Sequence, residues 1–127
     1  MAAPREGPIS VPPIDPSVLA GLTGGNTDIE QAVLANFRRV NEEDAMMLER
    51  AVDEQSIANV SRAAHRMKGA CRMIGAHALA AIAEVIERAS RNEDWQAVRS
   101  SMAAFDAERD RLDNWIDGLQ RHSAGVE

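Results

Sequence analysis

Residues 54–76 of the chain read EQSIANVSRAAHRMKGACRMIGA, and this stretch has the spacing of one amphipathic helix. At 100° per residue, its apolar side chains fall on a single side of the helix. We predict a helix over residues 54–74, with Asp53 as its N-terminal cap and Gly75 directly after its last turn. The predicted buried side consists of Val60, Ala63, Ala64, Met67, Ala70, Cys71 and Ile74.

The opposite side of this helix is polar and carries the residue types of a reactive site. A glycine inside a helix costs about 1 kcal/mol relative to alanine, and this chain is otherwise rich in alanine. Gly69 lies one turn beyond His65, where the missing side chain would let another molecule approach the imidazole. The predicted outward face consists of Ser61, His65, Lys68, Gly69 and Arg72, with Arg62 and Arg66 beside it.

The sequence on both sides of this helix predicts further helices joined by short turns. Residues 1–14 hold four of the five prolines and are expected to form a disordered linker. Short turns force neighbouring helices to be antiparallel. We therefore predict an all-α fold, an antiparallel up-down four-helix bundle with a short additional N-terminal helix, over residues 15–121, followed by a flexible tail at 122–127. The expected flanking helices cover residues 16–22, 27–52, 77–90 and 93–121.

The apolar spacing of these flanking helices predicts which of their side chains point inward. A capping box at Thr27 and a cap at Asn92 are expected to start the second and the last helix. The predicted inward side chains are Ile29, Val33, Phe37, Val40, Met47, Leu48 and Val52 in the second helix, Leu79, Ile82, Val85 and Ile86 in the fourth, and Trp95, Val98, Met102, Phe105, Leu112, Ile116 and Leu119 in the last.

The composition excludes several classes of protein. The chain has 127 residues, 14 basic and 20 acidic, and a formal net charge of −6, which disfavours nucleic acid and anionic membranes as partners. A single cysteine excludes an internal disulfide framework and a multi-cysteine zinc site. No apolar run is long enough to span a bilayer, and the N-terminus lacks the pattern of a secretory signal. We therefore expect a cytoplasmic protein that does not contact a membrane.

The charges are unevenly distributed, because residues 55–83 contain no carboxylate although the chain as a whole is acidic. This segment holds His65 and also Lys68, the only lysine. Cations near the ring disfavour its imidazolium form, so we expect a neutral, nucleophilic histidine at neutral pH. The same cations would stabilise an anionic group on the ring. These features together indicate a histidine that accepts a phosphoryl group.

Residues 65–76, HRMKGACRMIGA, resemble the signature His-x-x-Lys-Gly-x5-Gly-Ala of histidine phosphotransfer (Hpt) domains. Ala64, Leu79 and the pair Ile86-Glu87 extend the likeness, which in outline covers residues 15 to about 120. The stretch AHRMKGACRMIGA is most similar to the C-terminal Hpt domains of tripartite hybrid sensor kinases of the BvgS and EvgS type.

The chain departs from the family pattern in the following helix. Many members carry Cys-x-x-Leu-Glu there, whereas this chain has Ala83-Glu84-Val85-Ile86-Glu87. We expect this difference to affect core packing and not the site.

The resemblance implies a phosphorelay intermediate of a two-component system. His65 would take a phosphoryl group at Nε2 from a receiver-domain aspartate and pass it to an aspartate of a response regulator. Lys68 would steady the phosphoryl oxygens, Gly69 would leave room for the receiver, and Gly75 would form the turn between two helices. The expected docking residues are Ser61, Arg62, Arg66, Arg72 and Met73.

The resemblance also limits what this domain does alone. Magnesium and the acidic pocket belong to the receiver, so we expect no cofactor, no metal and no autonomous kinase activity here. The family's bundles are mostly monomeric, and the domain would be either free-standing or the cytoplasmic C-terminal part of a membrane-bound sensor kinase.

Other interpretations of the same residues stay open. A surface histidine is often only solvated, which would make the chain a helical interaction module with an idle His65. A sensor-kinase dimerisation helix is a further alternative, but Arg66 stands where such helices usually carry an acid. A zinc site of His65, Cys71 and His77 is disfavoured, because their spacing does not bring them together and Cys71 faces the core.

Overall fold

The computed structural model describes residues 11–125, which contain five helices and no strand. Most of the predicted linker, residues 1–10, lies outside this range. The last helix continues past residue 121, where the sequence predicted its end. None of the helices in the described part is both long and apolar enough to cross a membrane. The helices are α1 (Pro16–Thr23), α2 (Thr27–Asp53), α3 (Ile57–Ile74), α4 (His77–Arg91) and α5 (Trp95–Gly125).

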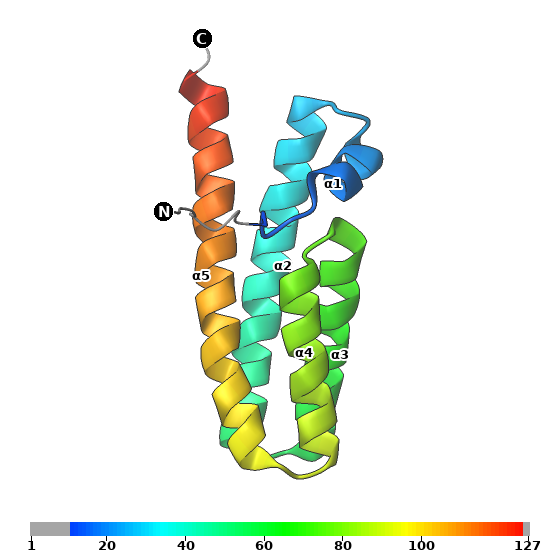
Figure 1. The fold of residues 1–127 in the computed structure, drawn as a ribbon, viewed down its shortest axis with the longest axis vertical. Coiled ribbons are helices and arrows are strands. Elements are labelled where there is room, and N and C mark those ends of the chain that lie inside the picture. The colour runs from blue at the N-terminus through cyan, green and yellow to red at the C-terminus, as the bar shows by residue number, and fades with distance from the viewer. Residues whose placement is uncertain (1–10, 126–127) are drawn as a thin grey trace, which may run out of the picture.

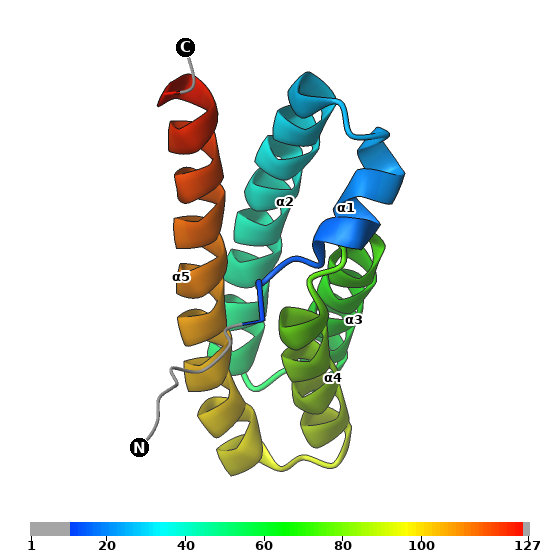
Figure 2. The ribbon, with the colours of Figure 1, turned by 45° about the horizontal axis from the view of Figure 1, so that its top comes forward.

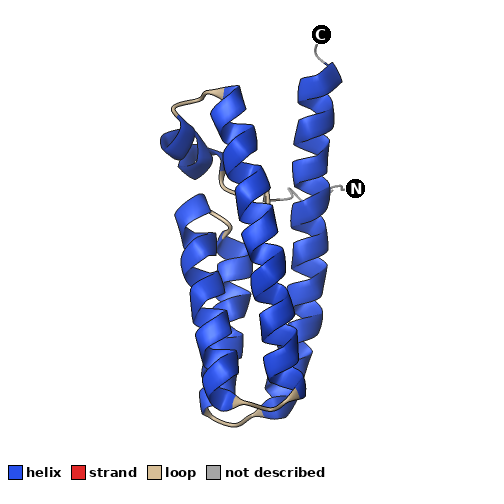
Figure 3. Ribbon diagram, turned by 180° about the vertical axis from the view of Figure 1, so that it is seen from behind, coloured by secondary structure: helices blue, strands red, loops and turns tan. Residues whose placement is uncertain are grey.

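The four long helices run lengthwise, and each is antiparallel to the next (Figure 1). The short helix α1 crosses the end of the bundle beside the α3–α4 turn (Figure 2). Helices α2 and α5 extend beyond α3 and α4 at that end (Figure 3). The predicted all-α bundle with a short N-terminal helix is confirmed.

Three helices begin at caps other than those predicted. The hydroxyl of Ser56, not Asp53, accepts a hydrogen bond of 3.2 Å from the backbone N–H three residues further on and so caps α3. Asp94, not Asn92, does the same at the start of α5, at 3.1 Å. The cap of α2 is Asn26, one residue before the predicted capping box. All these residue types can cap a helix, so the sequence alone did not decide between close neighbours.

The turn between α3 and α4 depends on Gly75, which has φ +87°. A Cβ atom at this position would lie 2.8 Å from the Cβ of Val18 on α1, closer than two such atoms pack. The N–H of Ala76 donates to the carbonyl of Cys71 and completes the helix end. The predicted role of Gly75 in this turn is therefore explained by both its backbone angle and its packing.

The core lies between the four long helices. On α3 the predicted inward side is confirmed, except that Ala70 is only half-buried. The packing prediction for α4 also holds at the two positions where the chain departs from the family pattern, because Ala83 and Ile86 are fully buried. The largest fully buried side chains are those of Ile14, Leu34, Leu48, Met67, Leu79, Ile86, Phe105, Leu112 and Ile116.

Helix α2 buries Phe37, Leu48 and Val52 as predicted, but the rest of its inward side differs from the prediction. Ile29 and Met47 are 48% and 44% exposed, whereas the polar residues Asn41 and Asp44 are buried. The prediction counted only apolar residues, and it could not include polar side chains whose partners come from other helices. On α4, Val85 is likewise exposed and not inward.

The segment before α1 is part of the fold, which corrects the predicted linker boundary. Ile14 is completely buried in the core. The N–H of Asp15 donates to the carbonyl of Gly75 at 2.9 Å, and the Arg111 guanidinium donates to the carbonyl of Val11 at 2.7 Å. These bonds attach the segment to the α3–α4 turn and to α5, so the domain begins before residue 15.

Candidate functional site

His65 lies in the middle of α3 and is mostly exposed, with 69% of its side chain accessible. Gly69, one turn further along, has open space where a Cβ atom would be, because no atom beyond its chain neighbours and the backbone of its own helix lies within 4 Å. The predicted exposed histidine with a cleared approach is therefore present. Since α3 packs against both α2 and α4, its exposed side is flanked by side chains from these two helices.

A carboxylate from α4 contacts the histidine ring. Glu87 Oε2 lies 3.2 Å from Nδ1 of His65, and the Glu87 side chain itself is almost completely buried. The charged group that the structure places in hydrogen-bond contact with the ring is therefore an acid. The sequence argument considered only cations around His65, and the structure corrects it.

The same carboxylate is held by two cations. Lys68 Nζ donates to Oε1 of Glu87 at 2.9 Å, and the Arg91 guanidinium donates to Oε2 at 2.5 Å. Burial acts to raise the pKa of Glu87, but the hydrogen bond and charge of Lys68, together with the charge of Arg91, lower it overall. Glu87 is thus an ionised carboxylate at neutral pH, shared by His65, Lys68 and Arg91.

Lys68 is less exposed than the sequence suggested. Only 15% of its side chain is accessible, because its stem lies against the bundle and its ammonium group reaches Glu87. An ammonium group has three N–H donors, so Lys68 keeps donors for a further acceptor beside His65.

The predicted basic face is partly neutralised by other helices. Arg66 reaches the buried Asp44 of α2 at 3.5 Å, and Arg72 binds Glu84 of α4 at 2.8 Å. Burial raises the pKa of Asp44, and the charge of Arg66 acts in the opposite direction. Although residues 55–83 contain no carboxylate, this surface therefore carries carboxylates from α2 and α4.

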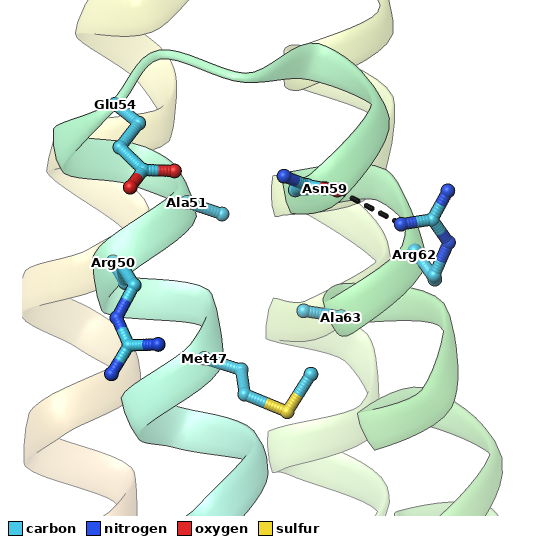
Figure 4. Close-up of a pocket in the computed structure, with 7 residues that line it drawn as sticks. All are labelled: Met47, Arg50, Ala51, Glu54, Asn59, Arg62 and Ala63. Atoms are coloured by element: carbon cyan, nitrogen blue, oxygen red, sulfur yellow. Dashed lines mark hydrogen bonds between the residues drawn. The ribbon is translucent and has the colours of Figure 1, made fainter.

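Arg62 points away from the bundle and donates to the Asn59 side chain at 2.8 Å (Figure 4). Between Arg62 and α2 lies a shallow cavity of about 210 Å³, into which the Met47 side chain extends (Figure 4). Ser61, beside Arg62, is half-buried. The predicted docking residues thus share the outer surface of α3, but they do not converge on one point.

Met73 is 71% exposed and lies on the border of an apolar groove. The groove has a volume of about 530 Å³ and runs between α1, α2 and α3. Leu22 from α1 and Ile29 from α2 form part of its wall and are about half exposed. This apolar surface begins next to Gly69, since Ala70 and Met73 both line it.

The remaining candidates lie apart from this site. Cys71 is fully buried, and burial raises the pKa of its thiol to about 12, which leaves it a poor nucleophile. His77 begins α4 and lies 3.4 Å from the Asp15 carboxylate at the far end of α3. The side chain of His122 lies outside the described residues.

Glu87 is the site residue to which reasoning from the sequence assigned no role. The family likeness included it, but only as part of a packing pattern. A signal was available, because Glu87 shares one side of α4 with the buried residues Leu79, Ala83 and Ile86. A charged residue among buried positions needs a partner, so its phase on the helix points to a paired carboxylate.

Comparisons with known proteins agree with this geometry. A model of the Hpt domain family matches residues 32–122. Among solved structures, the crystal structure of histidine-containing phosphotransfer protein B (HptB) from Pseudomonas aeruginosa PAO1 matches with a TM-score of 0.78 and 25% identity, covering 88% of this chain and 98% of that one. A comparison with curated proteins found no match. Neither match supports a particular likeness to BvgS- or EvgS-type kinases.

Proposed function

The chain belongs to the Hpt domain family, which acts in phosphorelays, and on that premise we propose that His65 carries the phosphoryl group. The observation that supports this most strongly is the combination at one point of α3: an exposed imidazole, open space at Gly69, and an ammonium group three residues along. His65 would accept the group at Nε2 from a receiver aspartate and return it to an aspartate of a response regulator.

Lys68 would stabilise the phosphoryl group on the ring. Its Nζ is fixed by Glu87 and has donors left for phosphoryl oxygens. Hydrogen bonds between a cation and an anion are stronger than those between neutral groups. The magnesium ion and the acidic pocket would come from the receiver, so the domain would need no cofactor of its own.

Receiver domains are the partners of an Hpt domain, and we place their contact on the exposed side of α3. Gly69 would let the receiver approach His65, and the adjoining apolar surface at Met73 would supply contact area. Arg62, Arg66 and Arg72 would line the polar part of this contact. Their charges would assist encounter with an acidic receiver pocket.

Phosphoryl transfer to histidine variants tests the proposal. The protein is mixed with a phosphorylated receiver domain, and the acid-labile, base-stable label on it is measured. We expect the wild type and His77→Gln to be labelled equally, because His77 lies at the end of the bundle, and His65→Gln to remain unlabelled. Equal labelling of His65→Gln, or no transfer from the cognate receiver to the wild type, would overturn the assignment.

We also propose that the domain is a cytoplasmic monomer without membrane contact. The buried apolar side chains of the described helices are covered within one chain, which supports a monomer. Light scattering on the purified protein tests this, and a stable dimer would contradict it. A place at the C-terminus of a BvgS- or EvgS-type sensor kinase stays a prediction of the sequence.

A further inference from the structure

A buried carboxylate on α2 holds a cation next to His65. The side chain of Asp44 is only 4% exposed, and its Oδ1 lies 3.5 Å from Nη2 of Arg66. Among the residues that the structure describes, Asp44 forms no other ion pair. The Arg66 side chain is 58% exposed, so its guanidinium is attached to the bundle on one side and open to solvent on the other.

Arg66 lies where a partner approaching His65 would meet it. It follows His65 directly on α3, and Gly69 comes three residues later, so Arg66 and Gly69 are neighbours on the helix surface. The space at Gly69 is open, and the apolar groove at Met73 begins beside it. Because Asp44 belongs to α2, it holds the Arg66 guanidinium on the side of α3 that faces α2.

The buried charge of Asp44 lowers the stability of the fold. Burial raises the pKa of Asp44, although the charge of Arg66 acts in the opposite direction. A raised pKa means that the ionised carboxylate is less favourable in the folded protein than in the unfolded chain. Glu87, by contrast, has a lowered pKa because its cations stabilise its charge. A destabilising charge whose partner is exposed beside a reactive residue indicates a role in function and not in stability.

An arginine held in this way can still bind a second acceptor. A guanidinium group has five N–H donors in a planar fork, and only its Nη2 faces Asp44. The remaining donors fit a carboxylate, which guanidinium groups bind through paired hydrogen bonds. Binding normally costs conformational entropy when a flexible side chain is immobilised. Prior attachment to Asp44 reduces this cost for Arg66.

Resting on the receiver contact proposed for the exposed side of α3, we propose that Asp44 is a positioning residue that holds Arg66 for an acidic group of the docked receiver domain. Arg66 makes the contact, and Asp44 acts only through it, because Asp44 is buried. The pair lies on the α2 side of α3, whereas Lys68 reaches Glu87 on α4. The pair therefore sets the affinity for the receiver and not the rate of the transfer step.

Receiver binding by Asp44→Asn tests the proposal, because asparagine keeps the shape of the side chain and removes its charge. The unphosphorylated cognate receiver is titrated into the protein by calorimetry, and transfer from the phosphorylated receiver gives KM and kcat. We expect the dissociation constant and KM to rise roughly two- to tenfold, the effect of losing one prior immobilisation. The value of kcat should stay within about twofold of the wild type.

The matched control is Glu49→Gln, which also removes one carboxylate from α2. Glu49 lines a cavity with Arg99 and Met102 of α5, so it lies away from the Arg66 contact, and its removal should leave receiver binding as in the wild type. Equal receiver affinities for Asp44→Asn and Glu49→Gln would overturn the proposal.

The effect of Asp44 should disappear when Arg66 is absent. We expect Arg66→Gln alone to weaken receiver binding at least as much as Asp44→Asn does. The double variant Asp44→Asn/Arg66→Gln should then bind like Arg66→Gln. If Asp44→Asn weakens binding equally with and without Arg66, Asp44 acts through the packing of α2 and the proposal is wrong.

Two measurements on the isolated protein separate positioning from folding. Asp44→Asn should be at least as stable as the wild type in urea at neutral pH, and a less stable variant would show a structural role and contradict the proposal. The ¹⁵N–¹H NMR signal of Arg66 Nε–H, identified by its loss in Arg66→Gln, should report faster side-chain motion in Asp44→Asn than in Glu49→Gln. Unchanged motion would also overturn the proposal.

These results do not depend on whether His65 carries the phosphoryl group, because the titrated receiver is unphosphorylated and the NMR uses the protein alone. If the wild type itself does not bind the receiver, the proposed receiver contact fails, and the role of Asp44 fails with it. If the wild type binds and Asp44→Asn binds equally well, only the role of Asp44 fails.

Discussion

Lys68 binds Glu87 and lies three residues along α3 from His65, whose ring would be phosphorylated. We expect Lys68→Ala to slow transfer from a phosphorylated receiver by roughly tenfold or more, since one donor to the transferred group is lost. The fold should persist, as Arg91 still pairs with Glu87. Stopped-flow transfer kinetics and circular dichroism measure the two effects.

The control for Lys68→Ala is Arg88→Ala, which also removes one positive charge. Arg88 pairs with Glu84 and not with Glu87. Transfer by this variant should be close to that of the wild type. Equal rates for Lys68→Ala and Arg88→Ala would remove Lys68 from the mechanism.

The buried carboxylate of Asp44 gives a pH dependence of known sign. Its pKa is raised by burial, so the folded protein keeps this proton to a higher pH than the unfolded chain does. This group therefore lowers the stability progressively as the pH rises from about 4 through its raised pKa. In Asp44→Asn that loss is absent, so the gain in the free energy of unfolding over the wild type should grow towards neutral pH. Urea denaturation across this range measures it, and a pH-independent difference would contradict the assignment.

At the residue scale, the sequence predicted the α3 members of the site but not Glu87. His65, Lys68 and Gly69 are neighbours on one helix, so helical periodicity alone brings them together. Glu87 is separated from His65 by 22 residues and joins it only through the packing of α3 on α4. The same limit applies to Asp44 and Arg66, whose pairing depends on how α2 is rotated against α3.

At the scale of the helix, Gly69 should lower the stability of α3 while leaving room for a receiver at His65. Different substitutions at this position can test the two effects separately. The space around it is open, so Gly69→Ala should raise the free energy of unfolding by up to about 1 kcal/mol through helix propensity. Gly69→Leu should also fold, but its side chain would extend over the approach to His65 and slow receiver transfer. Thermal unfolding and transfer kinetics test the pair. Unaltered transfer by Gly69→Leu would count against the access argument.

Replacing Gly75 is expected to lower the stability of the protein, whereas Gly69→Ala should raise it. Its backbone has φ +87°, and a Cβ atom would collide with Val18. Gly75→Ala should therefore lower the free energy of unfolding by about 2 kcal/mol or more, as measured by urea denaturation. A variant as stable as the wild type would show that the turn can rearrange.

The ends of the helices were predicted less well than their existence. In the α2–α3 and α4–α5 turns, Gln55 and Glu93 have φ angles of 53° and 56°. Each stands directly before the residue that caps the next helix, Ser56 or Asp94. Neither residue type favours this left-handed conformation, so no local signal identified the true start.

At the scale of the whole molecule, the fold was predictable because short turns join strongly amphipathic helices. The packing of the segment before α1 against the end of the bundle was not predictable from the sequence. Ile14 lies in a proline-rich stretch without helical periodicity, yet it is buried where the segment before α1 meets the α3–α4 turn and α5. Such a contact depends on the assembled bundle, and no spacing rule predicts it.

We expect Ile14→Ala to lower the free energy of unfolding by about 2–4 kcal/mol, the usual cost of truncating a buried isoleucine. Val11→Ala is the matched control, because the Val11 side chain is exposed and should have little effect. Chemical denaturation compares the two. Similar stabilities would mean that the segment does not seal the core.

The net charge of −6 does not represent the charge of the surface around His65. Arg66 and Arg72 are each paired with a carboxylate from a neighbouring helix, so the surface around His65 carries both signs of charge. We therefore expect receiver binding to depend on apolar contact at Met73 as well as on charge.

The central claim is that His65 carries the phosphoryl group on Nε2, the nitrogen opposite its contact with Glu87. The most direct test is NMR of ¹⁵N-labelled protein phosphorylated by its receiver domain. The account predicts one phosphorus signal with scalar coupling to Nε2 of His65. Phosphorus coupled to Nδ1, or to a nitrogen of another histidine, would contradict it.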